Sequence, residues 1–364
     1  MRRIPVYQPD LSGNEKKYVD DCIDSTWISS KGKYVSEFEK LFSSYIGTKY
    51  AISVNNGTAA LHLALMMAGI NKEDEVIVPA LTYIATANAV TYVGAKAVFV
   101  DSDEETWQIN PELIIEKISP KTKALIVVHL YGHPCNMRKI VDISKKYGLL
   151  LIEDCAEAIG SEYEGKKVGS FGDISCFSYF GNKTMTTGEG GMVLTSDENL
   201  YQQGKKLKNQ GVEEMYEYWH NLVGYNYRMT NICAAIGCAQ MERVDRFISR
   251  KKEIAKLYYD YLKDLPVKPH NKSPNVVHTY WMVSILVRDK IERNRMAQFL
   301  AGHGVETRPT FCPIPDMPMY KNNENYPVAE MIGACGMNLP SWPGLMDRDV
   351  KEICDMIHDF YLKE

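Results

Sequence analysis

Short apolar runs alternate with segments of helical periodicity from residue 50 to about residue 195, which is the pattern of a wound α/β sheet. Several runs are continuously apolar rather than alternating, so we expect helices to cover both faces of the sheet. The expected strands are Tyr50–Val54, Glu75–Val78, Ala97–Val100, Ala124–His129, Leu149–Ile152, Ile174–Phe180 and Gly191–Thr195. The expected helices between them are Thr58–Ala68, Ala85–Tyr92, Asn110–Ile118 and Met137–Lys146.

The C-terminal third follows a different order. A long helical pattern over residues 229–264 leads into a polar, proline-bearing stretch at residues 266–274, which marks a boundary. Beyond it we expect a strand, a helix and a closing amphipathic helix, at Tyr280–Leu286, Arg293–His303 and Asp347–Leu362. A chain of 364 residues is long enough for two domains. We therefore expect a large domain over residues 1–240, whose N-terminal segment borders the substrate, and a small C-terminal domain over residues 241–364.

Charge and composition exclude several classes of protein. The formal net charge is -4 and both signs are interspersed, without the basic stripe that nucleic acids require. The N-terminus lacks the apolar core of a signal peptide, and no stretch approaches the roughly 18 apolar residues of a membrane span. Nine cysteines without a CxxC pair suggest reduced core residues, and neither a disulfide framework nor a zinc site is expected. We therefore expect a cytoplasmic protein that binds neither membranes nor nucleic acids.

Two residues near the middle of the chain suggest a covalently bound cofactor. Lys183 lies between an aromatic-rich run, Phe177–Phe180, and the glycine-rich Gly188–Gly191, while Asp154 ends an apolar run upstream. Pyridoxal phosphate (PLP) is an electron sink while its pyridine nitrogen stays protonated, and a buried carboxylate maintains that state. A desolvated lysine can hold PLP as an imine and later move a proton. Lys183 alone would by default be a solvated side chain, and Asp154 alone could equally be a helix cap or a surface carboxylate, but together they predict a PLP site.

Other polar residues also fall at strand ends, where open α/β sheets bind ligands. Gly57 and Thr58 open a helix whose free N–H groups suit a phosphate, with Ser178 as a further donor, although an ordinary helix cap is the alternative. Tyr83 is a candidate to stack on the pyridine ring or simply to pack. His129 and His133 straddle a strand end, and we favour a structural or substrate-side role over a metal site. No GxGxxG or P-loop motif is present.

Six short blocks spread along the chain are typical of one enzyme family. They are Ser25–Gly32, Asn56–Leu61, Glu153–Ala158, the Lys183 segment, Gly224–Thr230 and Glu306–Pro309. On these blocks the chain resembles the DegT-type nucleotide-sugar aminotransferases over nearly its whole length. The resemblance implies the aspartate aminotransferase-like, type I PLP fold. That fold has a large α/β domain with a mixed, mostly parallel sheet, and a smaller α+β C-terminal domain.

The resemblance also implies roles for individual residues. Lys183 would form the internal aldimine with PLP, Asp154 would pair with the pyridine nitrogen, and Glu157 would lie near the cofactor's phenolic oxygen. Tyr83 would stack on the ring, and Gly57, Thr58 and Ser178 would hold the phosphate. Asn226 would reach the phosphate bound by the other subunit, so that complete sites need a homodimer. Trp27, Ser29 and Arg308 would lie near the nucleotide sugar, although Arg308 has a surface ion pair as its alternative.

The implied reaction moves the amino group of L-glutamate to carbon 4 of GDP-4-keto-6-deoxy-mannose, for a surface polysaccharide such as O-antigen. A UDP- or dTDP-4-keto-6-deoxyglucose is the alternative acceptor. A PLP sugar dehydratase is less favoured because those enzymes have histidine in place of Lys183, and a non-enzymatic PLP-binding regulator is less favoured because the site residues are intact. One departure concerns the substrate: Cys312 and Pro315 stand where relatives commonly have an aromatic residue and a histidine.

Overall fold

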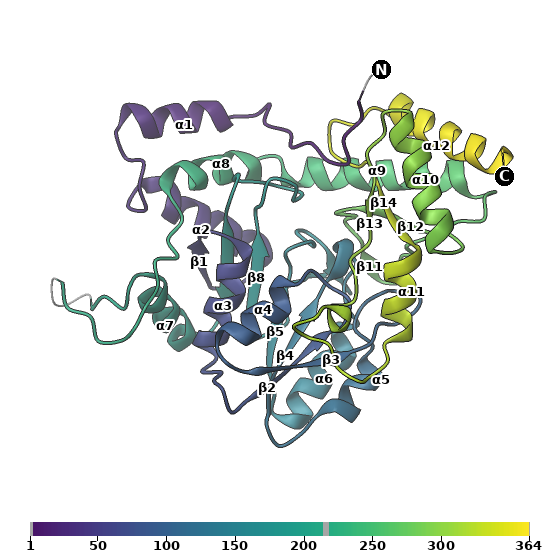
Figure 1. Ribbon diagram of the computed structural model, residues 1–364. Coiled ribbons are helices and arrows are strands. Elements are labelled where there is room, and N and C mark those ends of the chain that lie inside the picture. Colours follow the sequence, from purple (N-terminus) through teal and green to yellow (C-terminus); the bar gives the residue numbers. More distant parts are fainter. Residues whose placement is uncertain (1–2, 214–217, 364) are drawn as a thin grey trace.

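The computed structural model describes residues 3–213 and 218–363 (Figure 1). Its centre is a seven-stranded sheet with the order β1-β9-β8-β5-β4-β2-β3. The strands are β1 (Tyr50–Val54), β2 (Glu75–Pro79), β3 (Lys96–Val100), β4 (Thr122–Val128), β5 (Leu150–Asp154), β8 (Ile174–Ser178) and β9 (Gly191–Thr195). All neighbours are parallel except β9, which runs antiparallel to both β1 and β8. The predicted mixed, mostly parallel sheet is confirmed.

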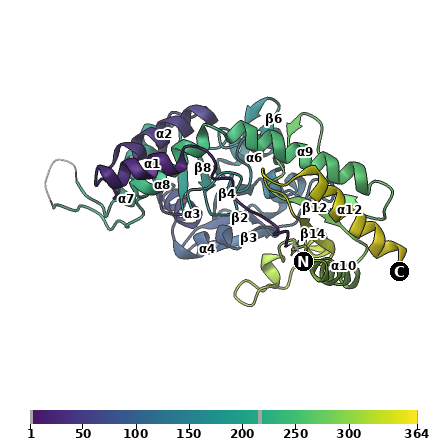
Figure 2. The ribbon, with the colours of Figure 1, turned by 90° about the horizontal axis from the view of Figure 1, so that it is seen from above.

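Helices cover both faces of this sheet, as its continuously apolar strands predict. Strands β4 and β8 are buried almost throughout. The helices of the large sheet and its N-terminal approach are α1 (Glu15–Asp24), α2 (Lys33–Ile46), α3 (Gly57–Met67), α4 (Ala85–Tyr92), α5 (Pro111–Ile114), α6 (Met137–Tyr147), α7 (Glu198–Lys208) and α8 (Asn231–Met241). One apolar core packs around α3, and a second lies between α2, α8 and β8. Figure 2 shows the same layers from above.

A second, antiparallel sheet lies in the C-terminal part of the chain. Its order is β10-β12-β14-β13, from Lys268–Pro269, Val283–Leu286, Gly336–Leu339 and Arg308–Pro309. Helices α9 (Val244–Leu262), α10 (Lys290–Gly302) and α12 (Asp347–Leu362) bury a core with it, and α11 (Pro327–Cys335) precedes β14. A third, small sheet joins β11 (Val276–Val277), β6 (Glu162–Tyr163) and β7 (Lys166–Lys167). This α+β arrangement confirms the fold expected for the C-terminal domain, while the boundary at residue 240 stays a prediction.

Four expected elements differ clearly in the structure. The expected helix Asn110–Ile118 is a four-residue α-helix, α5, followed by a 3-10 turn at Ile115–Lys117. The pattern over residues 229–264 forms two helices, α8 and α9, separated by a turn at Glu242 and Arg243, and the Arg243 guanidinium pairs with Asp10 at 2.6 Å. The expected strand Tyr280–Leu286 begins only at Val283, because Tyr280 has a φ of 50° and the preceding residues bond to the loop after β4. The expected strand Ile174–Phe180 ends at Ser178, where the chain turns.

The N-terminal segment joins the two parts of the molecule. Ile4 forms a bridge with Val305 beside α10, and Val6 accepts a hydrogen bond from the Ser341 N–H group at 3.1 Å. From there the chain runs to α1, which lies on α8 at the far side of the molecule (Figure 1). Within the described ranges, no helix is long and apolar enough to cross a membrane.

Three histidines are buried together beside the loop that follows β4. The ring centroids of His133, His270 and His278 lie 4.9–5.4 Å apart, and the His270 ring stacks on Trp107 at 4.1 Å. Burial lowers the pKa of His133 to about 4 and that of His270 to about 3, and it lowers the pKa of His278 well below its usual value. The folded protein therefore holds all three neutral.

This cluster predicts acid sensitivity. Because the folded pKa values lie below the unfolded value near 6.5, the stabilisation is complete above pH 6.5 and is lost as the pH falls towards 4. Between pH 7.5 and 5.5 we expect the free energy of unfolding to fall by about 1 kcal/mol per histidine, or by a few kcal/mol in all. Urea denaturation at the two pH values measures it. His270→Phe should lessen the fall by about a third, and substitution of the exposed His303 should not; equal falls in wild type and His270→Phe would contradict this.

Candidate active site

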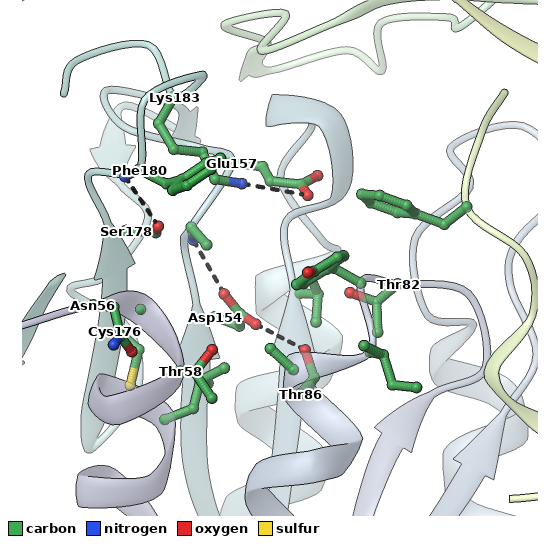
Figure 3. Close-up of a pocket in the computed structure, with 18 of the residues that line it drawn as sticks. Asn56, Thr58, Thr82, Thr86, Asp154, Glu157, Cys176, Ser178, Phe180 and Lys183 are labelled. Carbon is green, nitrogen blue, oxygen red and sulfur yellow. Dashed lines mark hydrogen bonds and ion pairs between the residues drawn. The ribbon is translucent and has the colours of Figure 1, made fainter. Parts of the chain in front are cut away.

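A cavity of about 920 Å³ opens at the carboxyl ends of β4, β5 and β8, between the large sheet and the segment 308–312. Open α/β sheets bind ligands at this edge. Predicted residues that line the cavity are Gly57, Thr58, Tyr83, Asp154, Glu157, Ser178, Lys183 and Arg308. Figure 3 shows several of them around one space. The structure thus brings together residues that lie far apart in the sequence.

Lys183 enters the cavity from the turn that follows β8. Its backbone N–H group donates to the Phe180 carbonyl at 2.9 Å, and its side chain is only 12% exposed. The Lys183 Nζ atom lies 3.8 Å from Glu157 Oε1 (Figure 3). Burial lowers the pKa of Lys183, and the nearby carboxylates of Glu157 and Asp154 oppose this shift. The amine is therefore desolvated, as a lysine that forms an imine needs to be.

Glu157 is held in place by the backbone. The Tyr131 N–H group donates to Glu157 Oε2 at 2.8 Å, which leaves Oε1 on the side of Lys183. Burial raises the pKa of Glu157 to about 7, although the Lys183 ammonium lowers it. A carboxyl group with a pKa near neutrality can exchange a proton with a neighbouring oxygen or amine.

Asp154 ends β5 beneath the cavity. One of its carboxylate oxygens accepts from the Thr86 hydroxyl at 2.9 Å, and the other accepts from the Ala156 N–H group at 3.1 Å (Figure 3). The residue is 4% exposed, and burial raises the pKa of its carboxyl group. A buried carboxylate of this kind is stabilised by a cationic partner. Asp154 is thus suited to hold a protonated pyridine nitrogen.

The start of α3 forms a cradle for an anion. The Asn56 side chain accepts from the Ala59 N–H group at 2.8 Å and caps the helix, which leaves the first N–H groups, those of Gly57 and Thr58, without an intrahelical partner. A Cβ atom at Gly57 would lie 2.8 Å from Ser178 Cβ, so only glycine lets the two backbones approach this closely. The cradle and the Asp154 carboxylate together fit the phosphate and ring of PLP.

The remaining predicted residues lie at the rim or elsewhere. Tyr83 is 57% exposed at the rim, and its ring centroid lies 5.7 Å from that of Phe311. Arg308 lines the cavity and also pairs with Glu306 at 2.7 Å, so both of its predicted roles remain open. Trp27, Ser29 and Asn226 are described residues outside the wall of this cavity. Their substrate and cofactor contacts stay predictions.

The structure adds residues that the sequence did not single out. Thr86, Trp281 and Phe311 line the cavity beside the predicted set. Thr86 lies in the first turn of α4, shortly after Tyr83, so the argument from strand ends could have identified it. Trp281 and Phe311 come from distant segments of the chain, which that argument does not reach. Of the two departures from the family pattern, Cys312 is exposed at the cavity wall, while Pro315 is buried.

His129 has a structural environment. Its Nε2 atom lies 3.1 Å from Glu153 Oε2, and both side chains are fully buried. Within the described part of the chain, His129, Glu153 and Cys155 form a group with metal-ligating atoms. However, Glu153 already accepts from the N–H groups of Gly169, Phe171 and Gly172, and His129 Nδ1 accepts from that of Cys135. These bonds use the atoms that a metal would need.

Fold and site together define a class of protein, the PLP-dependent aminotransferases with the type I fold. The chain belongs to the DegT/DnrJ/EryC1/StrS aminotransferase family, whose model matches residues 9–358. The family, the fold and the cofactor expected from the sequence are therefore confirmed.

Individual relatives match over nearly their full length. GDP-perosamine synthase of Escherichia coli O157:H7 is 56% identical over 362 residues, which cover 99% of both chains. The GDP-perosamine synthase of Vibrio cholerae is 48% identical over 98% of this chain and 99% of its own. Among solved structures, the PLP form of Spr1654 from Streptococcus pneumoniae has a TM-score of 0.94 at 29% identity and covers 100% of this chain and 99% of its own.

Proposed function

We propose that this enzyme transfers the amino group of L-glutamate to carbon 4 of GDP-4-keto-6-deoxy-mannose, giving GDP-perosamine for O-antigen or another surface polysaccharide. The observation that carries the proposal is the likeness to two GDP-perosamine synthases, at 56% and 48% identity over at least 98% of this chain. The reaction fits the site, because transamination needs an amine, an acid and a ring-nitrogen partner in one cavity, which Lys183, Glu157 and Asp154 supply.

Each of these residues has a separate task in the proposed reaction. PLP, when bound, supplies an electron sink that stabilises negative charge on the substrate carbon. Lys183 holds the cofactor and then moves a proton with its Nζ atom. Glu157 Oε1, 3.8 Å from that atom, would keep the amine in place and would lie near the phenolic oxygen of bound PLP as a group able to exchange a proton. Asp154 keeps the ring nitrogen protonated, and the cradle of Gly57, Thr58 and Ser178 orients the phosphate.

The nucleotide sugar is compatible with the size of the cavity. A volume of about 920 Å³ lies at the upper end of the range for small-molecule sites. Arg308 at its small-domain edge offers a guanidinium for the anionic diphosphate. We place Trp27 and Ser29 at the nucleotide sugar bound by the other subunit, since neither lines the cavity of its own chain.

We also propose a homodimer with shared active sites. Large apolar side chains are exposed on two segments. At the end of α1 and just after it they are Ile23, Trp27 and Ile28, and on the loop after α7 they are Tyr218, Trp219 and Val223. Large apolar side chains left exposed on two segments are consistent with an interface that covers them. Asn226, whose side chain accepts from Arg228 Nε at 3.0 Å, follows the same loop and is available to a second copy of the chain. The nine unpaired cysteines favour the reducing cytoplasm as the compartment.

The acceptor is tested by a direct comparison of substrates. GDP-4-keto-6-deoxy-mannose and the UDP- and dTDP-linked 4-keto-6-deoxyglucose sugars are incubated separately with enzyme and L-glutamate. We expect kcat/KM to be at least about 100-fold higher for the GDP-linked sugar, because a site built to hydrogen-bond one base leaves its polar groups unpaired with another. Release of 2-oxoglutarate and the mass of the amino sugar measure the reaction. A preference for UDP or dTDP would overturn the assignment of the substrate, and dehydration without 2-oxoglutarate would overturn that of the reaction.

A further inference from the structure

Trp281 touches the catalytic lysine in two different ways. Its ring centroid lies 3.9 Å from Lys183 Nζ, so that the amine rests over the indole face. Its indole N–H group donates to the carbonyl oxygen of Asn182 at 2.7 Å, on the residue directly before the lysine. One side chain therefore contacts both the reactive atom and the turn that carries it.

The indole is itself fixed from several sides. Trp281 is 5% exposed, and its backbone N–H group donates to the Tyr131 carbonyl at 3.0 Å. Its ring lies nearly parallel to that of Tyr131, at 11° with centroids 6.1 Å apart. The backbones of Tyr131 and Trp281 approach closely because Gly132, with a φ of +93°, has no side chain. A Cβ atom at Gly132 would lie 3.0 Å from the backbone nitrogen of Trp281. The indole is thus a rigid surface.

The amine consequently rests between two groups. Glu157 Oε1 lies 3.8 Å from Nζ and the indole centroid lies 3.9 Å from it. The backbone N–H group of Tyr131 fixes Glu157, and the Tyr131 carbonyl accepts from the N–H group of Trp281. Glu157 and the indole of Trp281 thus form the two walls of a slot around the amine, and the backbone of Tyr131 holds both walls. A lysine side chain has four flexible torsions, and a slot restricts the positions that its amine samples.

We propose that Trp281 is a positioning residue for the reaction: its indole face and Glu157 form a slot for the Lys183 amine, and its N–H group holds the turn. The proposal rests on the assignment of Lys183 as the cofactor lysine. With PLP bound, Lys183 would hold the cofactor until the substrate enters, and its amine would then be free to carry a proton. The slot would keep the freed, neutral amine near the carbon whose proton it takes, and the aromatic face would then attract the ammonium group that this transfer produces.

The test measures the Lys183 amine in the full-length protein freed of PLP. Competitive acetylation with acetic anhydride over a pH series, read by mass spectrometry of the Lys183 peptide, gives the apparent pKa of this amine. The remaining lysines of the same sample are internal standards. The ring face favours the ammonium form, so Trp281→Leu should lower this pKa by about one unit, or raise the neutral fraction about tenfold below both pKa values.

Two variants make the experiment decisive. Tyr7→Phe removes the hydroxyl that donates to the Lys183 carbonyl but leaves the indole, and it should leave the pKa near the wild-type value. Trp281→Phe retains a ring without the N–H group and should lower the pKa by about half as much, because phenyl attracts a cation less strongly than indole. If Trp281→Leu does not fold, Trp281→Phe decides. An unchanged Lys183 pKa in a folded Trp281 variant would overturn the proposal.

The loaded enzyme supplies a second readout. We expect Trp281→Leu to lower kcat about tenfold while KM for L-glutamate stays within about twofold, since the slot acts on the proton transfer and not on substrate binding. Because the acetylation needs neither cofactor nor substrate, it separates the two proposals. If Trp281→Leu lowers the pKa of Lys183 but the wild-type enzyme transfers no amino group, only the proposed function is refuted. If the wild-type enzyme transfers the amino group normally but the pKa of Lys183 is unchanged in Trp281→Leu, only the proposed slot is refuted.

Discussion

Lys183→Ala should abolish transamination and the visible absorbance of lysine-bound PLP. The substitution removes the amine that holds the cofactor and also the base that moves the proton, and loss of a positioned acid or base alone lowers rates by about 10²- to 10⁴-fold. We expect kcat to fall by about 10³-fold or more. The release of 2-oxoglutarate measures turnover, and a spectrum of the purified protein with added PLP measures the bound cofactor.

Two further variants define what is lost. Lys183→Arg retains a cation between Glu157 and Trp281 but cannot form the imine, and it should be as inactive as the alanine variant. Lys96→Ala removes an exposed lysine that pairs with Glu75 at 2.9 Å, and it should leave both readouts unchanged. Amino transfer at the wild-type rate by Lys183→Ala, or reduction by borohydride that labels another lysine, would refute the assignment.

Two inactive variants should restore activity to each other when their subunits mix. Lys183→Ala would lose its own cofactor site, and Asn226→Ala should lower activity about 10- to 100-fold if, as proposed, it removes a hydrogen bond to a charged phosphate in the partner's site. In a mixed dimer, one of the two sites combines an intact Lys183 from one chain with an intact Asn226 from the other. Random pairing therefore should restore about a quarter of the wild-type activity. Co-expression from two differently tagged genes and a turnover assay measure it.

The control for this experiment uses two residues of one cavity. Asp154 and Lys183 line the same cavity of a single chain, so a mixture of Asp154→Ala and Lys183→Ala leaves no site intact and should regain nothing. Equal recovery in both mixtures, or full activity of Asn226→Ala alone, would show that the sites are not shared between subunits.

Much of the large domain was predictable because its signals are local. Strands β1 and β9 and helices α4 and α12 have the bounds expected from hydrophobic periodicity. The cavity was predictable for a related reason: in a parallel sheet, strands end at one edge, so Asp154, Ser178 and the start of α3 had to meet there. The identity of the cofactor followed from the chemistry of Lys183 and Asp154 together.

The contacts that were missed depend on tertiary packing. No residue at the break between α8 and α9 stops a helix by itself, and Arg243 at this break pairs with Asp10, which is far away in the sequence. The sequence around Trp281 predicts an apolar strand. In the structure this segment instead forms backbone hydrogen bonds to the carbonyl groups of Tyr131 and Gly132, which bend it away from the strand. The three buried histidines are spread from residue 133 to residue 278, and their neighbourhood has no periodic signal.

The direction of β9 decides where Lys183, the proposed cofactor lysine, lies. Ser178 pairs with Gly191, so the chain leaves the sheet and re-enters it at the same edge, and Lys183 sits on the excursion between them. If β9 ran parallel to β8, the chain would first have to cross back to the other end of the sheet, usually through a helix. Both ends of the excursion instead lie next to the anion cradle at the start of α3. A Cβ atom at Gly191 would lie 2.4 Å from the Asn56 carbonyl oxygen, so the two backbones are in close contact there. Lengthening or shortening this excursion would consequently displace the lysine and the cradle together.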